Sequence, residues 1–391
     1  MSEKMLTGYR VVEYSAMSTG AMFASRFLAD YGAEVIKVEI PNDPDDDSRK
    51  LPPIVNGVSA TYANLNSGKK SVSLDFRTPE GHEMLMKLLK TADIFIAAEP
   101  MKYLAKKGID YDTVKAANPS IIYGTLTCYG QTGPYKDIKG NDLVSQAFTA
   151  SMTITNYKDS LPMKMGYNVG GYFGAINLVV GLIGSIYKRN ETGKGQMVDV
   201  AMTDSIIASM CTLTAHYYVN GRMPTPGQSL AGVNDDPTKE RIGARGLYKT
   251  KDGYECISAN QEHLLRKIHA YLGVPNLLDT PEFQQEMKDT SVTTAINRHL
   301  TEWTTTKTKQ EVFIEISEAG APACPVLDYK EILENDNIAN KRGMFQEVDE
   351  PGIGKMKVSM VSAHMMNCPA EIAGPAELQG QSNDAVLGAL K

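Results

Sequence analysis

The stretch PMKMGYNVGGYFGAINLVVGLIGSIYKRNETGKGQMVDVAM, residues 162–202, decides the fold. Its glycine-rich start leads into an apolar segment, 175–187, which predicts a buried helix. The tight turn TGKGQ at 192–196 follows, and MVDV at 197–200 then begins a strand with alternating apolar residues. A buried helix that turns directly into a strand is typical of a sheet covered by helices.

The same alternation of short strands and helices runs through the residues that precede this stretch. Such alternation predicts a parallel, doubly wound sheet of the Rossmann-like kind. Strand patterns lie at 9–14, 34–39, 70–75, 93–97 and 121–126, and helical patterns lie at 21–30 and 78–91.

A Gly- and Pro-rich segment, 221–243, separates this alternating part from the rest of the chain and is typical of a linker. A hairpin pattern and several amphipathic helices follow it. We therefore predict an α/β protein with a Rossmann-like large domain and an inserted, smaller α+β domain. The predicted parts are the large domain's first segment at 1–200, a linker helix at 201–224, the small domain at 225–328 and a return to the large domain at 329–391.

Composition excludes several classes of protein. The 391 residues carry a net charge of −6, which argues against a nucleic-acid partner. No apolar run reaches the roughly 18 residues of a membrane span, and the first ten residues lack the apolar core of a signal peptide. Five scattered cysteines without a CxxC pair and six histidines without metal-ligand spacing favour reduced thiols and no metal. We expect a cytoplasmic protein without a membrane partner.

Three groups of motifs carry a resemblance that spans nearly the whole chain. Turn chemistry alone can explain each Gly- or Pro-rich piece, but their joint order and spacing are much harder to obtain by chance. The groups are LADYGAEVIKVE at 28–39, NLNSGKKSVSLD at 64–75 with YGQTGPY at 129–135, and the stretch 162–202. Together they resemble the class III (CaiB/BaiF-type) coenzyme A transferases.

This resemblance implies an interlocked homodimer, with an acyl-CoA and a small carboxylic acid as its reaction partners. Coenzyme A would be a substrate, and no permanently bound cofactor is implied. In the family an Asp attacks the acyl-CoA thioester, which gives a mixed anhydride and free CoA thiolate. The thiolate returns to form an aspartyl-CoA thioester, and an incoming carboxylic acid then takes over the CoA.

The nucleophilic Asp of the family lies ten residues before the glycine equivalent to Gly181, and this chain has Gly171 there. Glycine has no side chain to acylate, so the resemblance implies a transferase impaired at its nucleophile position. Either Gly171 replaces an Asp of an altered wild type, or the chain is a natural paralogue that binds acyl-CoA without transferring it. Asp142 matches an acidic position of the family, where it would assist from the pocket wall or simply cap a helix.

The resemblance also carries over a set of binding residues. Backbone N–H groups of the turn 168–172, before the helix expected at 175, would hold the developing oxyanion. The loop 227–245 would contribute to acyl specificity. The residues implied near the thioester are Thr19 and Gly20, those near the nucleotide are Ile40 and Leu74, and those near the phosphates are Lys106 and Lys139.

Two other enzyme classes fit the sequence less well. An α-methylacyl-CoA racemase would need a His after Gly140, where this chain has Asn141, and it would need the Asp that is missing at Gly171. A nicotinamide dehydrogenase would need GxGxxG directly after the first strand, and MSTGAM at 17–22 does not supply it. The alternatives that stay open are a CoA transferase and a non-catalytic acyl-CoA-binding paralogue, with a racemase-like enzyme less favoured.

Overall fold

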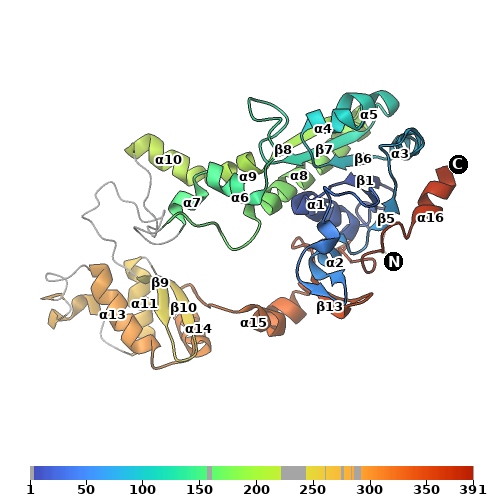
Figure 1. Cartoon of the computed structure of the whole chain (residues 1–391). Coiled ribbons are helices and arrows are strands. Elements are labelled where there is room, and N and C mark those ends of the chain that lie inside the picture. Colours follow the sequence, from blue (N-terminus) through green and yellow to red (C-terminus); the bar gives the residue numbers. More distant parts are fainter. Residues whose placement is uncertain are drawn as a thin grey trace. The chain divides into compact units, whose positions relative to one another are not determined.

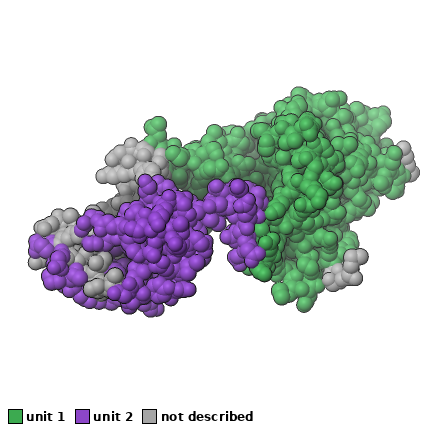
Figure 2. Space-filling view, turned by 90° about the horizontal axis from the view of Figure 1, so that it is seen from below, with its two compact units in different colours: residues 1–227, 339–391 green, residues 228–338 purple. Residues whose placement is uncertain are grey.

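A computed structural model describes residues 4–155, 161–221, 244–259, 261–273, 277–282, 284–285 and 292–390. The chain forms two compact units, one of residues 1–227 with 339–391 and one of residues 228–338 (Figure 2). The predicted small domain, 225–328, ends before helix α15 (Tyr329–Glu334), which belongs to the smaller unit. Residues 222–243, where the predicted linker ends and that domain begins, lie outside the described residues.

A six-stranded parallel sheet forms the centre of the larger unit (Figure 1), in the order β5-β2-β1-β6-β7-β8. Counted along the chain, this order is 3-2-1-4-5-6, the arrangement of a Rossmann fold. The predicted α/β class is therefore confirmed. The strands are β1 (Arg10–Tyr14), β2 (Glu34–Glu39), β5 (Lys70–Ser73), β6 (Ile94–Ala97), β7 (Ile122–Thr127) and β8 (Met197–Ala201).

Helices cover both faces of this sheet because successive strand residues point to opposite sides. Val11 packs into one apolar core with Leu28 of α1 and Leu178 of α8. Val12 packs into the other core with Leu88 of α3. Since both faces are buried, most strand residues are apolar, and the charged residues Glu13 and Lys37 are buried as partners of each other. The covering helices are α1 (Thr19–Asp30) and α8 (Val169–Thr192) on the first face, and α3 (Pro79–Lys90), α4 (Met101–Lys106) and α5 (Tyr111–Ala117) on the second.

The remaining elements of the larger unit are short. They include the hairpins β3–β4 and β12–β13 and several small helices. Their bounds are β3 (Ile54–Val55), β4 (Val58–Ser59), α2 (Ala60–Asn66), α6 (Asp142–Phe148), α7 (Ser151–Ile154), β12 (Phe345–Glu350), β13 (Gly354–Ser359) and α16 (Asn383–Leu387).

Helix α8 begins earlier than the predicted start at Ala175, and its first turn contains two glycines that apolar periodicity alone does not assign to a helix. With 24 residues it is long and apolar enough to cross a membrane by length and composition, which the uninterrupted apolar runs of the sequence did not predict. Buried residues make up 56% of its most apolar window, as expected for a helix that packs in a core.

The linker helix predicted at 201–224 is interrupted. The chain instead forms α9 (Met202–Ser209) and α10 (Cys211–Asn220), so the prediction of one continuous helix is wrong. Met210 adopts φ −100° and ψ 30° between the two helices, outside the helical region, and so separates α9 from α10.

A buried charge cluster joins β1 to its neighbours. Glu13 accepts hydrogen bonds from Lys37 Nζ at 3.2 Å and from Lys69 Nζ at 2.9 Å. Burial by itself would raise the pKa of Glu13, but the two ammonium groups and nearby hydroxyls lower that pKa to about 2. Removing one partner would leave an unpaired buried charge, so the cluster fixes β1 against β2 and against the residue before β5.

The C-terminal segment covers the exposed edge of β5. Ser71 N donates to Glu377 Oε2 at 2.7 Å, and Ser73 N donates to Asn383 Oδ1 at 2.8 Å. Figure 1 shows α16 beside β5. An open strand edge readily pairs with other chains, so these side chains protect the sheet.

The smaller unit has its own antiparallel sheet, in the order β11-β10-β9, with helices packed against it. Its apolar core contains Ile257 of β10, Leu265 of α11 and Ile316 of α14. The mixture of strands and helices is the α+β arrangement that the hairpin and helix patterns predicted. The elements are β9 (Ala244–Lys249), β10 (Tyr254–Ala259), α11 (Glu262–Tyr271), α13 (Val292–Thr304), α14 (Lys309–Glu318) and β11 (Ala323–Pro325).

Glu255 on β10 is a buried carboxylate whose two side-chain oxygens have no hydrogen-bond partner among the described residues. Burial raises the pKa of Glu255 to about 7, although Lys309 acts in the opposite direction. Below about pH 7 the folded protein therefore favours the protonated, neutral form of this side chain.

We predict that Glu255 makes the protein less stable as the pH rises. The folded pKa of about 7 exceeds the ordinary value of 4.5, so the folded state holds the additional proton between these pH values. The stability contribution is complete below pH 4.5 and is lost as the pH rises through 7. Glu255→Gln should therefore raise the melting temperature, relative to the parent, by more at about pH 8 than at about pH 5.

Thermal unfolding followed by circular dichroism at both pH values measures this difference. The control is Glu334→Gln, which changes an exposed carboxylate and should shift the melting temperature equally at both pH values. A Glu255→Gln shift that does not depend on pH would contradict the prediction.

Candidate active site

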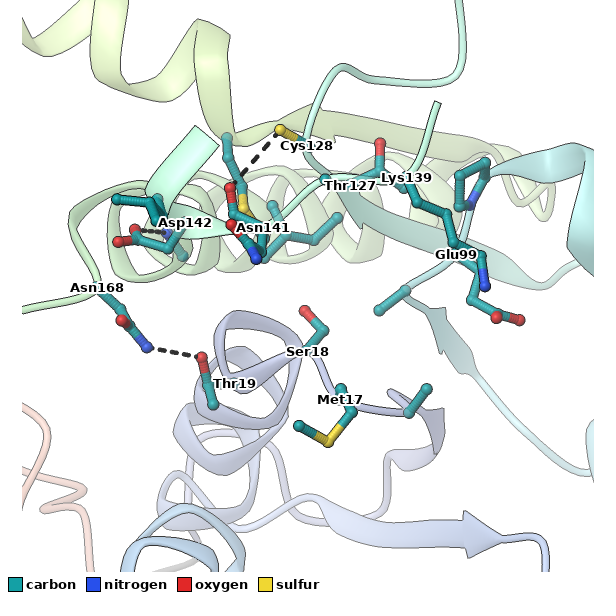
Figure 3. A pocket seen from close by; sticks show the side chains of 18 of the residues that line it. Met17, Ser18, Thr19, Glu99, Thr127, Cys128, Lys139, Asn141, Asp142 and Asn168 are labelled. Atoms are coloured by element: carbon teal, nitrogen blue, oxygen red, sulfur yellow. Dashed lines mark hydrogen bonds between the residues drawn. The ribbon is translucent and has the colours of Figure 1, made fainter. Parts of the chain in front are cut away.

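A cavity of about 460 Å³ opens at the carboxyl ends of β1, β6 and β7 (Figure 3). It is lined by residues at or just after the ends of these three strands, namely 16–19, 98–100 and 127–128. In a sheet of order 3-2-1-4-5-6 the connections diverge between the first and fourth strands, here β1 and β6, and ligands bind at this switch point. The fold itself therefore places a ligand site here.

Helices α1 and α8 approach each other closely at the cavity. A Cβ atom on Gly20 of α1 would lie 2.5 Å from the carbonyl oxygen of Gly171, so only glycine fits there. Gly171 of α8 is different, because a Cβ atom on it would meet no atom nearer than 3.7 Å. Gly171 lines the cavity, and the position has room for a side chain.

The carboxylate of Asp142, the first residue of α6, holds the start of α8. Its Oδ1 accepts hydrogen bonds from Gly170 N at 2.7 Å and from Gly171 N at 3.3 Å. These bonds satisfy N–H groups that have no partner within the helix, which explains why α8 begins at Val169. The expectation that this segment offers free N–H groups to a substrate oxyanion is therefore wrong for these two groups.

Two amide side chains position this corner of the cavity. Gln146, which is buried, donates from Nε2 to Asp142 Oδ2 at 2.7 Å, and its Oε1 accepts from Met165 N at 2.9 Å. Asn168 Nδ2 donates to Thr19 Oγ1 at 3.1 Å and so connects the start of α8 to the start of α1. Sequence reasoning missed Gln146, and it placed Asn168 in the turn 168–172 without predicting the bond of its side chain to Thr19. The i,i+4 spacing of Asp142 and Gln146 on one helix face was the available signal for Gln146.

Cys128 is the thiol of the cavity wall, but it is not prepared to react. It is buried, and Sγ donates a weak hydrogen bond to Asn141 O at 3.8 Å. Burial, with a smaller contribution from Asp142, raises the pKa of Cys128 to about 11. Because the thiolate is the nucleophile in thiol chemistry, Cys128 stays protonated and unreactive at neutral pH.

A cluster of lysines surrounds the ring of Tyr103 beside the cavity. The Nζ atoms of Lys139, Lys106 and Lys102 lie 4.9, 5.8 and 5.9 Å from the ring centroid. Ammonium groups bind to aromatic faces at such distances, and together they create a positive surface suited to phosphate groups. The resemblance implied that Lys106 and Lys139 lie near the phosphates of coenzyme A. It did not identify Lys102 or the Tyr103 ring that all three lysines contact.

The structure brings Thr19, Lys139, Asp142 and Gly171 together around one cavity. Figure 3 shows Asp142, Asn168 and Thr19 toward one end of it and Lys139 with Glu99 toward the other.

The other residues implied by the resemblance do not line this cavity. Gly20 lies in the contact between α1 and α8, Ile40 is buried in a core, and Leu74 is half-buried beside the same core. Their predicted contacts with coenzyme A stay predictions. Residues 227–243, which make up most of the loop 227–245 expected to contribute to acyl specificity, lie outside the described residues. Within the part of the chain that the structure describes, no three His, Cys, Asp or Glu side chains are grouped to hold a metal.

Comparison with known proteins defines the class. The chain belongs to CoA-transferase family III, whose family model matches residues 6–383, and the predicted resemblance is therefore confirmed.

Individual relatives and one solved structure are similar to this chain over almost all of its length. The succinate–glutarate CoA-transferase of Agrobacterium fabrum is 28% identical over 392 residues, covering 99% of this chain and 96% of that protein. The formyl-CoA:oxalate CoA-transferase of Bradyrhizobium sp. (strain ORS 278) is 27% identical, covering 98% of this chain and 93% of that protein. The crystal structure of a CaiB/BaiF family protein from Brucella suis has a TM-score of 0.83 and 27% identity, covering 100% of both chains.

We predict opposite effects for alanine on the two sides of the helix contact. Gly20→Ala should lower the free energy of unfolding by about 1–3 kcal/mol, because its Cβ meets backbone that cannot easily move. Gly171→Ala should leave stability unchanged or raise it by up to about 1 kcal/mol, because its Cβ has space and alanine favours the helix. Urea unfolding of the two variants measures both effects. A comparable loss in Gly171→Ala would show that the position is not open.

Proposed function

We propose that this chain is a CoA transferase that moves CoA from an acyl-CoA thioester to a small carboxylic acid in the cavity at the switch point. One observation carries the proposal: a single cavity joins Gly171, the family's nucleophile position, to Lys139 of the cluster around Tyr103. Coenzyme A has phosphates at one end and the thioester at the other, so an extended site with cations at one end suits it.

The chemistry proposed for the site is covalent transfer through an aspartyl anhydride and an aspartyl-CoA thioester. With glycine at 171, the usual carboxylate is missing, and we propose that the unaltered chain transfers CoA slowly. The relatives carry names that specify succinate, glutarate, oxalate and D-citramalate. These are short acids with more than one carboxyl group, and we propose acceptors of this kind.

The second candidate function is that of a non-catalytic acyl-CoA-binding paralogue, and Gly171 is the observation that favours it. A racemase-like activity is less favoured, because Asn141 stands where such an enzyme needs its histidine. The Asn141 side chain instead accepts a hydrogen bond from Val144 N at 3.3 Å and caps α6.

We predict that Gly171→Asp raises CoA transfer by at least about 100-fold, because losing a nucleophile typically costs several orders of magnitude in rate. The chain and the variant would receive succinyl-, butyryl- and cinnamoyl-CoA with a panel of acids that includes glutarate, oxalate and citramalate. Mass spectrometry would follow new thioesters. Gly388→Asp is the matched control, since Gly388 is an exposed glycine with open space around it that lies outside both the cavity and helix α8.

The two functions give different results in this experiment. A large gain confined to Gly171→Asp would support the transferase, and the best acceptor would identify the substrate class. If neither protein transfers CoA although calorimetry detects acyl-CoA binding to both, the binding paralogue is the better description.

We also propose the homodimer that the family resemblance implies. Exposed apolar side chains support it: Val180 and Tyr187 of α8 are 66% and 70% exposed, and Tyr218 of α10 is 84% exposed. Such surfaces are typical of association sites. Light scattering should give twice the chain mass of 42.7 kDa at micromolar concentration, and a monomer mass would contradict this proposal.

A further inference from the structure

We infer that Asp142 is the carboxylate that accepts the acyl group in the unaltered chain. This inference rests on the proposed transferase function and identifies the group through which the slow transfer proceeds.

The position of Asp142 is the first argument. Its half-buried side chain lines the cavity, and its Oδ1 lies 3.3 Å from the backbone nitrogen of Gly171. The carboxylate therefore lies directly beside the position where the family's nucleophile would start. Figure 3 shows it at the same end of the cavity as Thr19, which the resemblance places beside the thioester.

The other candidate nucleophiles of the cavity are less suitable. Glu99 forms an ion pair with Lys107, and Figure 3 shows it toward the opposite end of the cavity. Asp45 lies on an exposed loop that follows β2. Cys128 holds its proton, as described above. Among the described residues that line the cavity, Asp142 is thus the carboxylate next to Gly171.

The hydrogen bonds of Asp142 leave one oxygen able to attack. Oδ1 accepts two N–H groups of α8, which use both of its lone pairs. Oδ2 accepts one N–H from Gln146 and keeps a second lone pair. We assign Oδ2 as the attacking atom and Gln146 as the residue that positions it.

The first transfer step then balances without a proton. The free lone pair of Oδ2 forms a C–O bond to the thioester carbon, and the C–S bond breaks with its electron pair leaving on sulfur. The products are a mixed anhydride on Asp142 and the CoA thiolate.

In the second step, the N–H groups of Gly170 and Gly171 become useful because Oδ1 is now the carbonyl oxygen of the aspartyl group. The thiolate attacks Cγ of Asp142, and negative charge develops on Oδ1, where the two donors stabilise it as an oxyanion hole does. Collapse breaks the bond between Cγ and Oδ2, whose electron pair stays on Oδ2, and Oδ2 leaves with the acyl group. A free carboxylate leaves, and an aspartyl-CoA thioester remains.

The reverse sequence delivers CoA to the acceptor. The incoming carboxylate attacks Cγ and displaces the thiolate, which gives a new anhydride. The thiolate then attacks the acyl carbon of the acceptor, and Asp142 leaves as a carboxylate with its original bonds. Because three hydrogen bonds stabilise the starting carboxylate, its attack is slower than that of an aspartate at 171, which agrees with an impaired enzyme.

Hydroxylamine trapping tests the inference, because hydroxylamine converts an acylated or thioesterified Asp into a hydroxamate that peptide mass spectrometry can locate. The parent, Asp142→Asn, Gly171→Asp and the double variant Gly171→Asp/Asp142→Asn would each receive the best acyl-CoA from the panel. The asparagine that replaces Asp142 keeps a carbonyl oxygen for the N–H groups of α8, so the helix start is retained. Asp45→Asn is the matched control, because it removes another carboxylate of the same cavity.

We expect a hydroxamate on Asp142 in the parent and in Asp45→Asn, and none in Asp142→Asn. We also expect Asp142→Asn to lower the parent's transfer rate by on the order of 10³-fold. The double variant should transfer CoA faster than Asp142→Asn and carry the hydroxamate on residue 171. This result would show that the cavity still works without the Asp142 carboxylate.

Several results would overturn the inference. A parent that transfers CoA only as fast as Asp142→Asn, or that forms its hydroxamate elsewhere, would show that Asp142 is not the acceptor. If Gly171→Asp turns over while the parent forms no hydroxamate on Asp142, only this inference fails. If Gly171→Asp is also inactive, the proposed transferase function fails, and the inference fails with it.

Discussion

The bond between the Asp142 carboxylate and the first turn of α8 determines the geometry of the whole site. Without an acceptor for Gly170 N and Gly171 N, two buried N–H groups would lack a partner, and the helix would begin later along the chain. Gly171 would then no longer lie against Gly20. One side chain thus determines where a core helix begins, how close α1 comes to α8, and which atoms face the cavity.

The buried cluster around Glu13 holds the opposite wall in place. Ser25 Oγ of α1 donates to Glu13 Oε2 at 2.5 Å, so the cluster connects α1 as well as β2 to the central strand. Thr19 begins α1, and its position over the carboxyl end of β1 therefore depends on charges buried below it. A site at a sheet edge gains its rigidity from such contacts between elements, because the loops that line it are exposed.

The sequence was sufficient to predict the sheet, because short segments rich in Val and Ile alternate with helical patterns along the first part of the chain. Through the family resemblance it was also sufficient to select four site residues that line one cavity, namely Thr19, Lys139, Asp142 and Gly171. It could not predict the early start of α8 or the role of Gln146. The early start of α8 depends on Asp142, which lies 28 residues before Gly170, and no local pattern encodes that contact. For Gln146 the i,i+4 spacing to Asp142 was a local signal, but its bond to Met165 depends on the tertiary fold. Tyr103 was missed although Lys102 and Lys106 lie beside it in the sequence, because the approach of the distant Lys139 to the same ring is visible only in the fold.

The closing of the β5 edge by the C-terminal segment has a consequence for protein synthesis. Ser71 leaves the ribosome 306 residues before Glu377, its partner. At translation rates of 5–20 residues per second, the interval is roughly 15–60 s. The nascent chain therefore exposes a sheet edge until Glu377 and Asn383 have been synthesised, a period far longer than collapse requires. Nascent chains that stall before Glu377 keep the β5 edge uncovered, and an open strand edge readily pairs with other chains.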